Sequence, residues 1–202
     1  MPKKSYKGKS TIGVKNLVFA PLTKDDETGY TYGDLVKAEG TIEVTITPQN
    51  TDLDVQYADD VEYDVIAQDP EIEVSVDMAS LPVQLQAEIH GHEYKDGVMV
   101  EKAGDTPSYY AMGFKAEKTD GSYRFVWLLK CRAKPGTETY RTKEGRDITR
   151  QTNNATFTAI KRTFDGKVRA VADESDEDFT GSANFLDTVY GGSSSADSGE
   201  GE

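Results

Sequence analysis

Runs in which apolar and polar residues alternate one by one recur along most of this chain, and each predicts a β-strand with one buried face. The run "EIEVSVDM" (71–78) predicts a strand whose inward side chains are Ile72, Val74, Val76 and Met78. Its acidic residues, Glu71, Glu73 and Asp77, then share the opposite face. The run "GTIEVTIT" (40–47) has the same pattern, with Glu43 outward, Pro48 as its expected end, and inward side chains Ile42, Val44 and Ile46.

Other segments extend this β pattern over the chain. Residues 12–22 predict a short strand ending at Pro21, and residues 24–34 have the composition of a loop. Residues 53–67 hold two alternating runs around Ala58-Asp59-Asp60, which predict a long acidic hairpin. Asp120-Gly121 predicts a second hairpin between runs 108–117 and 122–133. After a polar connection, strands are expected around Phe157 and Ile160 and at 166–173.

One segment favours a helix. In "SLPVQLQAEIHG" (80–91) apolar residues alternate as in a strand, but Leu81, Leu85 and Ile89 also lie four apart. Ser80 is a suitable N-cap, and Gly91 suits the position after the last turn. We therefore expect a helix over about 80–90.

Both histidines follow in "HGHEYKDG" (90–97), which raises the question of a metal site. The helix makes His90 its last residue, lets Gly91 turn left-handed, and leaves Lys95-Asp96-Gly97 to turn the chain. A metal site needs at least a third ligand, and Glu93 is too close in sequence to the histidines to serve easily as one. A structural turn is therefore the favoured interpretation, with a metal site and an interface contact as alternatives.

Charged residues are segregated along the chain, which adds the possibility of surfaces with opposite charge. Residues 43–105 hold 16 acids and two bases, whereas residues 115–169 hold 14 bases and six acids. Residues 1–24 carry six lysines and no acid, and residues 170–202 carry nine acids and no base. Two readings remain open: solvated faces that keep the protein in solution, or faces of opposite sign through which copies associate.

Composition indicates one globular domain with polar ends. We expect a flexible N-terminal arm (1–11), a β domain (12–173) and a largely disordered acidic, Gly/Ser-rich tail (174–202). No signal peptide and no membrane span are apparent, which favours synthesis in the cytoplasm and no membrane partner. Cys131, the single cysteine, lies in an apolar run and is expected to be a buried structural thiol.

The sequence contains few groups of residues in an arrangement typical of a catalytic or binding site. The sequence shows no phosphate-binding glycine loop, no nucleophile elbow and no calcium-loop spacing. We expect no catalytic, cofactor-binding or metal site and no cofactor. The residues alone thus predict a mainly antiparallel β protein with a structural or interaction role.

The order of several segments resembles major tail proteins of long-tailed, non-contractile phages of Gram-positive bacteria. The likeness lies in "GVKNLVFAPLT", "YADDVEYDV", "SLPVQLQAEIHGHEYKDGVMVE", "TPSYYAMGFKAEKTDGSYRFVWLLKCRAKPGTETYRTK", "TFTAIKR" and "DGKVRAVADE". The resemblance implies a tail-tube fold, a β-sandwich or barrel of two packed antiparallel sheets with one flanking helix and a long hairpin. It also implies a virion subunit of the tail tube, polymerised as stacked hexameric rings.

The implied partners are further copies of the chain, the tape measure protein, and the tail terminator and tail tip proteins. DNA would pass through the lumen at ejection without specific binding. Combined with the alternation, the resemblance makes four acids candidates for the lumen face: Glu43, Glu71, Glu73 and Asp77. It makes the 53–67 hairpin a candidate inter-ring contact, through Leu53, Asp54, Gln56, Tyr57, Asp59, Asp60, Glu62 and Tyr63. The polar segments 1–11 and 141–152 are candidates for further contacts between subunits or rings.

Three alternatives remain. A β-sandwich binding module for a receptor or carbohydrate would expose an aromatic patch, and the chain has 11 tyrosines. A hydrolase with acidic catalytic residues would need a cleft with perturbed carboxylates. The tube protein of a contractile tail would share the fold.

Overall fold

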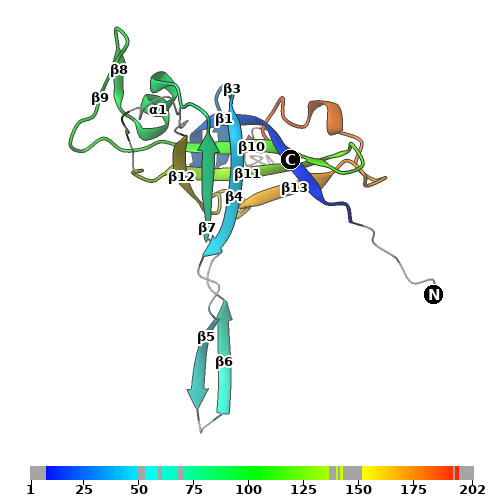
Figure 1. Ribbon diagram of the computed structural model, residues 1–202. Helices are drawn as coiled ribbons and strands as arrows, with labels where there is room; N and C mark the ends of the chain where they lie inside the picture. Colours follow the sequence, from blue (N-terminus) through cyan, green and yellow to red (C-terminus); the bar gives the residue numbers. More distant parts are fainter. Residues whose placement is uncertain are drawn as a thin grey trace, which may run out of the picture.

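The computed structural model describes residues 8–49, 53–58, 61–67, 71–136, 140, 142, 152–192 and 194–195. These residues form a mainly β structure with one α-helix (Figure 1). The first seven strands are β1 (Thr11–Asp26), β2 (Gly29–Tyr32), β3 (Val36–Ala38), β4 (Thr41–Gln49), β5 (Leu53–Ala58), β6 (Val61–Ala67) and β7 (Glu71–Met78). Helix α1 (Val83–His90) precedes β8 (Glu93–Lys95), β9 (Val98–Val100), β10 (Tyr109–Lys118), β11 (Tyr123–Ala133), β12 (Asn153–Ala159), β13 (Arg169–Asp173), the 3-10 turn η1 (Ser182–Asn184) and β14 (Ser194–Ser195).

Ten of these strands belong to one antiparallel sheet with the order β14-β2-β1-β10-β11-β12-β7-β4, to which β3 adds on β1 and β13 on β11. The expected mainly β fold with one helix and a long hairpin is confirmed. The strands that we expected in two packed sheets are joined into a single sheet, which does not close into a barrel within the described residues. The two hairpins β5–β6 and β8–β9 stand apart from it.

The division of β11 between two neighbours bends this sheet. Residues Arg124–Leu128 of β11 pair with β13, and residues Cys131–Ala133 pair with β12. Beyond β12 the sheet continues through β7 to β4, and β4 comes back close to β1. The main core therefore lies inside a curled sheet.

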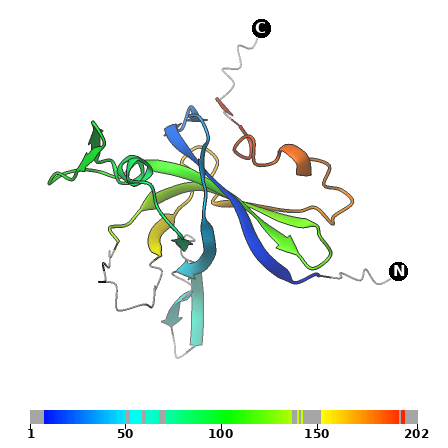
Figure 2. The same cartoon turned by 45° about the horizontal axis from the view of Figure 1, so that its top comes forward.

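The two faces of the β10–β11 pair carry separate cores. The main core joins residues from β1, β7, β10, β11 and β12 to Leu85 and Ile89 of α1. On the other face Trp127 and Leu129 of β11 pack with Val18, Ala20 and Ala111, together with Val189 near the C-terminus. Helix α1 accordingly packs against one face of these strands and the C-terminal segment against the other. In Figure 2 the helix (green) and the C-terminal segment (orange) also lie toward opposite ends of the strands.

Most strand assignments from the alternation are confirmed. Buried and half-buried residues alternate along β7 as predicted, and Cys131 and Trp127 are fully buried. The β10–β11 hairpin turns at Asp120-Gly121, where Gly121 has φ 83°. Residues 53–58 and 61–67 pair as the predicted hairpin.

The predictions that strands end at Pro21 and at Pro48 are both wrong. Proline lacks only the backbone N–H, so it can remain in an extended strand at an edge or an irregularity. Strand β1 runs through Pro21, which pairs with Tyr110, and the Pro21 carbonyl accepts the Gly33 N–H at 2.8 Å. The expected loop 24–34 instead contains the β1–β2 hairpin. Strand β4 runs through Pro48 and is the last strand of the sheet order, so the missing N–H interrupts no further pairing there.

Two smaller expectations also differ from the structure. Ile42 is 53% exposed because a register shift between Thr41 and Glu43 turns it outward, while Val44 and Ile46 pack against the main core. The helix begins at Val83, three residues after the expected cap Ser80. Pro82 keeps an extended ψ of 135°, and its carbonyl accepts the first helical N–H bond, from Gln86.

The C-terminal region folds back onto the sheet, and Ser194–Ser195 pair with β2. Trp127 Nε1 donates to the carbonyl of Phe185 at 2.9 Å, and the Phe185 ring lies 5.4 Å from that of Phe125. Tyr30 donates its hydroxyl to the carbonyl of Gly191 at 3.1 Å. Residues 174–192, which the sequence analysis groups with the tail, therefore cover the second core. Residues 196–202 lie outside the described residues.

A nearly buried ion pair ties the end of β1 to β11, and the same carboxylate holds the turn after β12. Asp25 Oδ2 lies 2.6 Å from Lys130 Nζ, and the carboxylate also accepts the N–H groups of Thr163 and Phe164. Burial raises the pKa of Asp25, but the Lys130 and backbone hydrogen bonds outweigh burial, so this pKa lies below its ordinary value of 3.8. The contact thus fixes the β1–β2 hairpin to the rest of the sheet.

Substituting Gly113→Ala will destabilise the protein by about 1–3 kcal/mol, because core overpacking has this cost. Gly113 pairs with Trp127, and a Cβ there would lie 2.7 Å from two atoms of the buried indole ring. Urea unfolding followed by tryptophan fluorescence measures the loss. The control is Gly13→Ala, also in a strand, whose Cβ meets nothing within 4 Å. Equal stability of the two variants would contradict the packing argument.

The protein will lose stability in acid as Asp25 becomes protonated. A carboxylate whose folded pKa is lowered contributes stability above its unfolded pKa, and that contribution disappears as the pH falls through the folded pKa. Asp25→Asn will cost about 3 kcal/mol at pH 7, since it leaves the nearly buried Lys130 ammonium without a carboxylate to balance its charge. It will also flatten the profile of unfolding free energy between pH 5 and pH 2, about the range over which such carboxylates titrate. Exposed Asp34→Asn serves as control, and an equal loss there would refute the assignment.

Candidate assembly surfaces

The strands β4, β7 and β12 carry a continuous polar surface on the side away from the main core. Pairing places three rows across these strands: Glu43–Asp77–Asn154, Thr45–Ser75–Thr156 and Thr47–Glu73–Thr158. Gln49 and Glu71 form a fourth pair beside them. We call these eleven residues the acidic face. It exists because every second residue of the three strands is polar, and the sheet pairs them in phase.

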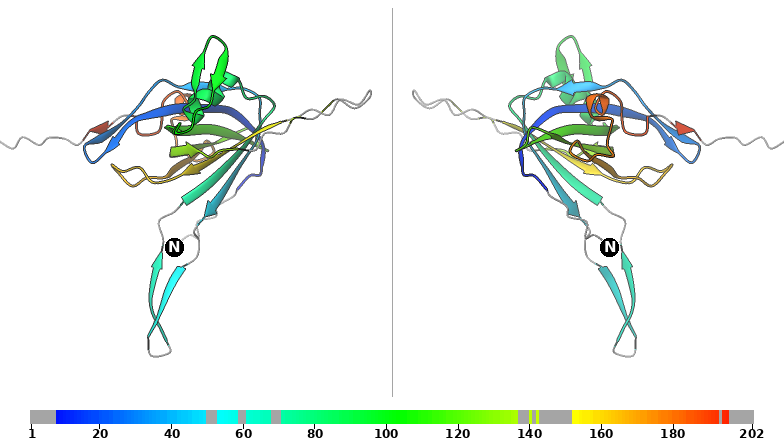
Figure 3. Two further views of the ribbon diagram at one scale, coloured as in Figure 1. Left: turned by 90° about the vertical axis from the view of Figure 1, so that its left-hand side faces the viewer. Right: turned by 90° about the vertical axis from the view of Figure 1, so that its right-hand side faces the viewer.

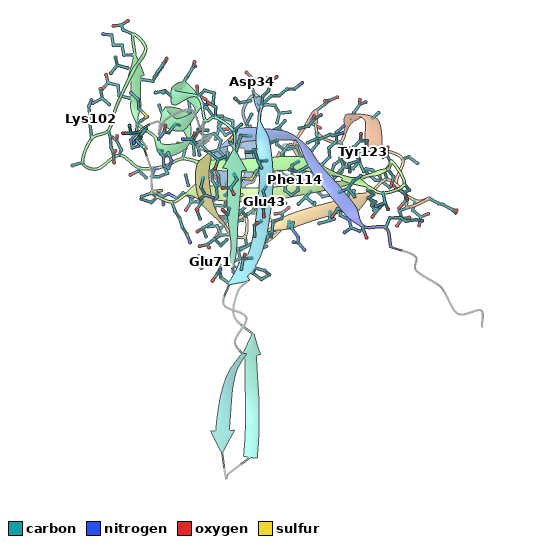
Figure 4. All side chains as sticks on the ribbon, viewed as in Figure 1. Asp34, Glu43, Glu71, Lys102, Phe114 and Tyr123 are labelled. Atoms are coloured by element: carbon teal, nitrogen blue, oxygen red, sulfur yellow. The ribbon has the colours of Figure 1, made fainter. Side chains whose placement is uncertain are left out.

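All four acids predicted from the sequence fall on this face. Glu43 lies on β4, and Glu71, Glu73 and Asp77 follow β7 at intervals of two or four residues. Figure 4 shows Glu43 along β4 and Glu71 at the start of β7, near the root of the long hairpin. The structure therefore brings together side chains that are up to 34 positions apart in the sequence.

Neighbouring polar groups hold several of these carboxylates in place. Asn154 Nδ2 donates to Asp77 Oδ1 at 2.6 Å and to Ser75 Oγ at 2.7 Å. Lys134 Nζ donates to Glu73 Oε2 at 2.7 Å, and Thr45 Oγ1 to Glu43 Oε1 at 3.0 Å. The eleven residues of the face include four acids and no base, so the face itself is acidic.

The part of this face that β12 supplies was not predicted from the sequence. Its signal was present in "NNATFTA", where Asn154, Thr156 and Thr158 alternate with small or aromatic residues that the structure buries. What the sequence does not contain is the pairing of β12 with β7, which places these residues next to the acids.

The long hairpin β5–β6 projects from the open end of the β4–β7 pair (Figures 1 and 3). Six of its candidate contact residues lie on the paired strands: Leu53, Asp54, Gln56, Tyr57, Glu62 and Tyr63. Tyr57 pairs with Glu62 after a register irregularity at Gln56. Candidate residues Asp59 and Asp60 lie outside the described residues, as does most of segment 141–152.

The histidines form a turn, as the sequence favoured. His90 ends α1, and Gly91 caps it in the left-handed conformation with φ 73°. His92 Nδ1 lies 2.8 Å from Asp105 Oδ2, which also accepts the Lys102 N–H. The hydrogen bond from His92 is the main reason that the pKa of Asp105 is lowered. Over the described ranges, His, Cys, Asp and Glu form no group of three or more that could hold a metal ion.

The remaining candidate for chemistry is Cys131, and its surroundings make it inert. Its side chain is completely buried in the main core, and burial raises the pKa of the thiol. A reactive cysteine needs access and a stabilised thiolate. The expectation of a structural thiol is confirmed.

Comparison with known proteins agrees with an assembly role. The family described as "Phage tail tube protein" matches residues 12–198. No curated protein matches the sequence. No helix in the described part of the chain is long and apolar enough to cross a membrane. Since the family match spans nearly the whole chain, the protein belongs to the phage tail tube proteins and is a structural component of the virion tail.

Proposed function

We propose that this chain is the major subunit of the tail tube of a long-tailed, non-contractile phage of Gram-positive bacteria. Copies form hexameric rings that stack around the tape measure protein, between the tail tip and the tail terminator proteins. The chain is made and assembled in the host cytoplasm, and its role is structural, not catalytic. The family match supports the tube, and the acidic face is the observation that carries the proposal.

The acidic face suits the lining of a conduit for DNA. Its four carboxylates lie in register on the paired strands β4 and β7, so they form one continuous acidic surface along the sheet. DNA carries one negative charge per about 1.7 Å of helix axis, and a protein binds it by replacing counterions with lysine and arginine. A ring of carboxylates repeated in each copy repels that backbone. The genome can then pass without adhering.

The long hairpin suits a contact between rings. It extends the β4–β7 pair beyond the body of the subunit, and a two-stranded hairpin alone is marginally stable in water. A neighbouring ring supplies the surface that an isolated hairpin lacks. Because β4 and β7 pair up to Gln49–Glu71 at its root, the hairpin is held by the sheet that carries the acidic face.

Replacing residues 53–67 by a short glycine-serine turn will leave a folded monomer that cannot build tubes. The β4–β7 pairing and both cores lie outside the deleted segment. Circular dichroism and thermal unfolding test folding, and negative-stain electron microscopy of the concentrated protein tests assembly. Truncation after residue 195 is the control and should leave tubes intact. Tubes of normal length from the deletion variant would refute the role of the hairpin.

Reversing charge on the acidic face will make the tube bind DNA. Glu43 and Asp77 lie directly opposite each other, so Glu43→Lys with Asp77→Lys places adjacent cations in every copy. The double variant should retard short duplex DNA on a gel at low salt, with loss of binding as salt rises. Glu27→Lys with Glu39→Lys makes the same charge change at exposed positions off this face. Equal binding by both variants, or a map with the four acids on the tube exterior, would end the lumen assignment.

A further inference from the structure

The small hairpin β8–β9 exposes apolar side chains that nothing in the described structure covers. Val98 is 59% exposed and Val100 is 44% exposed. Pairing sets Val98 opposite Lys95 and Val100 opposite Glu93, so both valines lie on one face of the hairpin. The other face holds Tyr94 and Met99. Adjacent exposed β-branched residues on a projecting element indicate a contact surface.

This hairpin is built to keep a defined shape. Asp96 and Gly97 have φ of 51° and 83°, the left-handed pair that a tight two-residue turn requires. Glu93 forms an ion pair with Lys102, and His92 pairs with Asp105 at the root. The hairpin also contacts α1. A rigid turn with two exposed valines fits a protruding contact that is shaped before it binds.

The far end of the molecule carries a groove beside β13. This β13 groove has a volume of about 750 Å³ and lies between β13 and the C-terminal segment. Val171 and Tyr190, which line it, are 50% and 45% exposed. Within the described residues β13 pairs with β11 alone, so its outer edge has free backbone groups.

The hairpin and the groove lie at opposite ends of the subunit. Figure 4 labels Lys102 beside the root of the hairpin at one end and Tyr123, next to the groove residue Arg124, at the other. The two side views of Figure 3 agree, since the hairpin faces the viewer from one side only. A protrusion and a recess at opposite ends generate a head-to-tail contact, which closes into a ring when the rotation allows.

Both surfaces carry charged side chains of both signs, some of which can pair across a contact. Asp96 at the hairpin tip and Glu101 beyond β9 are exposed and have no ion pair within the described part of the chain. The groove presents Lys167 and Arg169 on one side, with Arg169 also unpaired among the described residues, and Asp176 and Asp178 on the other. Between two copies, Asp96 can form an ion pair with Arg169, and Lys95 can form one with Asp176 or Asp178.

We propose that the β8–β9 hairpin of one copy docks into the β13 groove of the next copy in the ring. Val98 and Val100 pack against Val171 and Tyr190, and Asp96 pairs with Arg169. The inference rests on the proposed ring-forming function and specifies the lateral contact within a ring. It assigns a role distinct from that of the long hairpin, which projects elsewhere.

Crosslinking tests this contact directly, because the only natural cysteine is buried and unreactive. The variant Val98→Cys/Val171→Cys is concentrated, treated with a short bismaleimide and run on a denaturing gel. Both sites are exposed, so the fold should tolerate the changes. A ladder of multimers is expected, and each single-cysteine variant should stop at the dimer or below. The control pair is Val98→Cys/Glu27→Cys, which joins the hairpin to an exposed turn outside the groove.

Electron microscopy of the same samples separates this proposal from the proposed function. Rings or tubes with a ladder from the Val98/Val171 pair alone support both. Rings or tubes without that ladder, or with equal ladders from both pairs, overturn the docking and leave the tube function standing. A pair-specific ladder without rings or tubes supports the docking against the tube function. If neither a pair-specific ladder nor rings or tubes are seen, both the docking and the proposed tube function are overturned.

Discussion

The rest of this structure depends on one constraint: two different strands, β12 and β13, pair with the same edge of β11. One half of the strand pairs with β13 and the other half with β12, so the sheet cannot continue flat on that side. The β12 branch curls over the main core and presents the acidic face. The β13 branch diverges from it and leaves a groove. Two surfaces with different chemistry thus arise from a single strand.

The two cores make this arrangement rigid. Trp127 packs directly on Gly113 across the β10–β11 pair, and its indole N–H is held by the Phe185 carbonyl. The C-terminal segment is therefore a structural layer, although its composition is polar and acidic. On the other face, α1 closes the main core through Leu85 and Ile89. Helix α1 contacts the β8–β9 hairpin, and the C-terminal segment lines the β13 groove.

Much of this could be predicted from the sequence, and the failures share a physical cause. Alternation found β7, the β10–β11 pair and the long hairpin, because a half-buried strand imprints a period of two on its own residues. It could not find the pairing of β12 with β7 or the groove beside β13, since these join segments distant in sequence. The predictions for Pro21, Pro48 and Ile42 were wrong. Strand edges and bulges can hold a proline or turn a side chain to the other face, which a regular central strand does not allow. Residues 174–192 were grouped with the tail because the aromatic contacts of Phe179 and Phe185 are invisible in a composition dominated by acids.

The way in which the long hairpin is rooted has a mechanical consequence. Its two strands follow β4 and lead into β7, which are themselves hydrogen-bonded neighbours in the sheet. Tension on the hairpin would pull β4 and β7 in the same direction relative to the rest of the sheet. It would load the backbone hydrogen bonds between β7 and β12 in parallel, as shear, and would not peel them apart singly. This is the ladder that joins Asp77 to Asn154. A filament of such subunits would resist extension through its sheets while its surface side chains stay free to adapt.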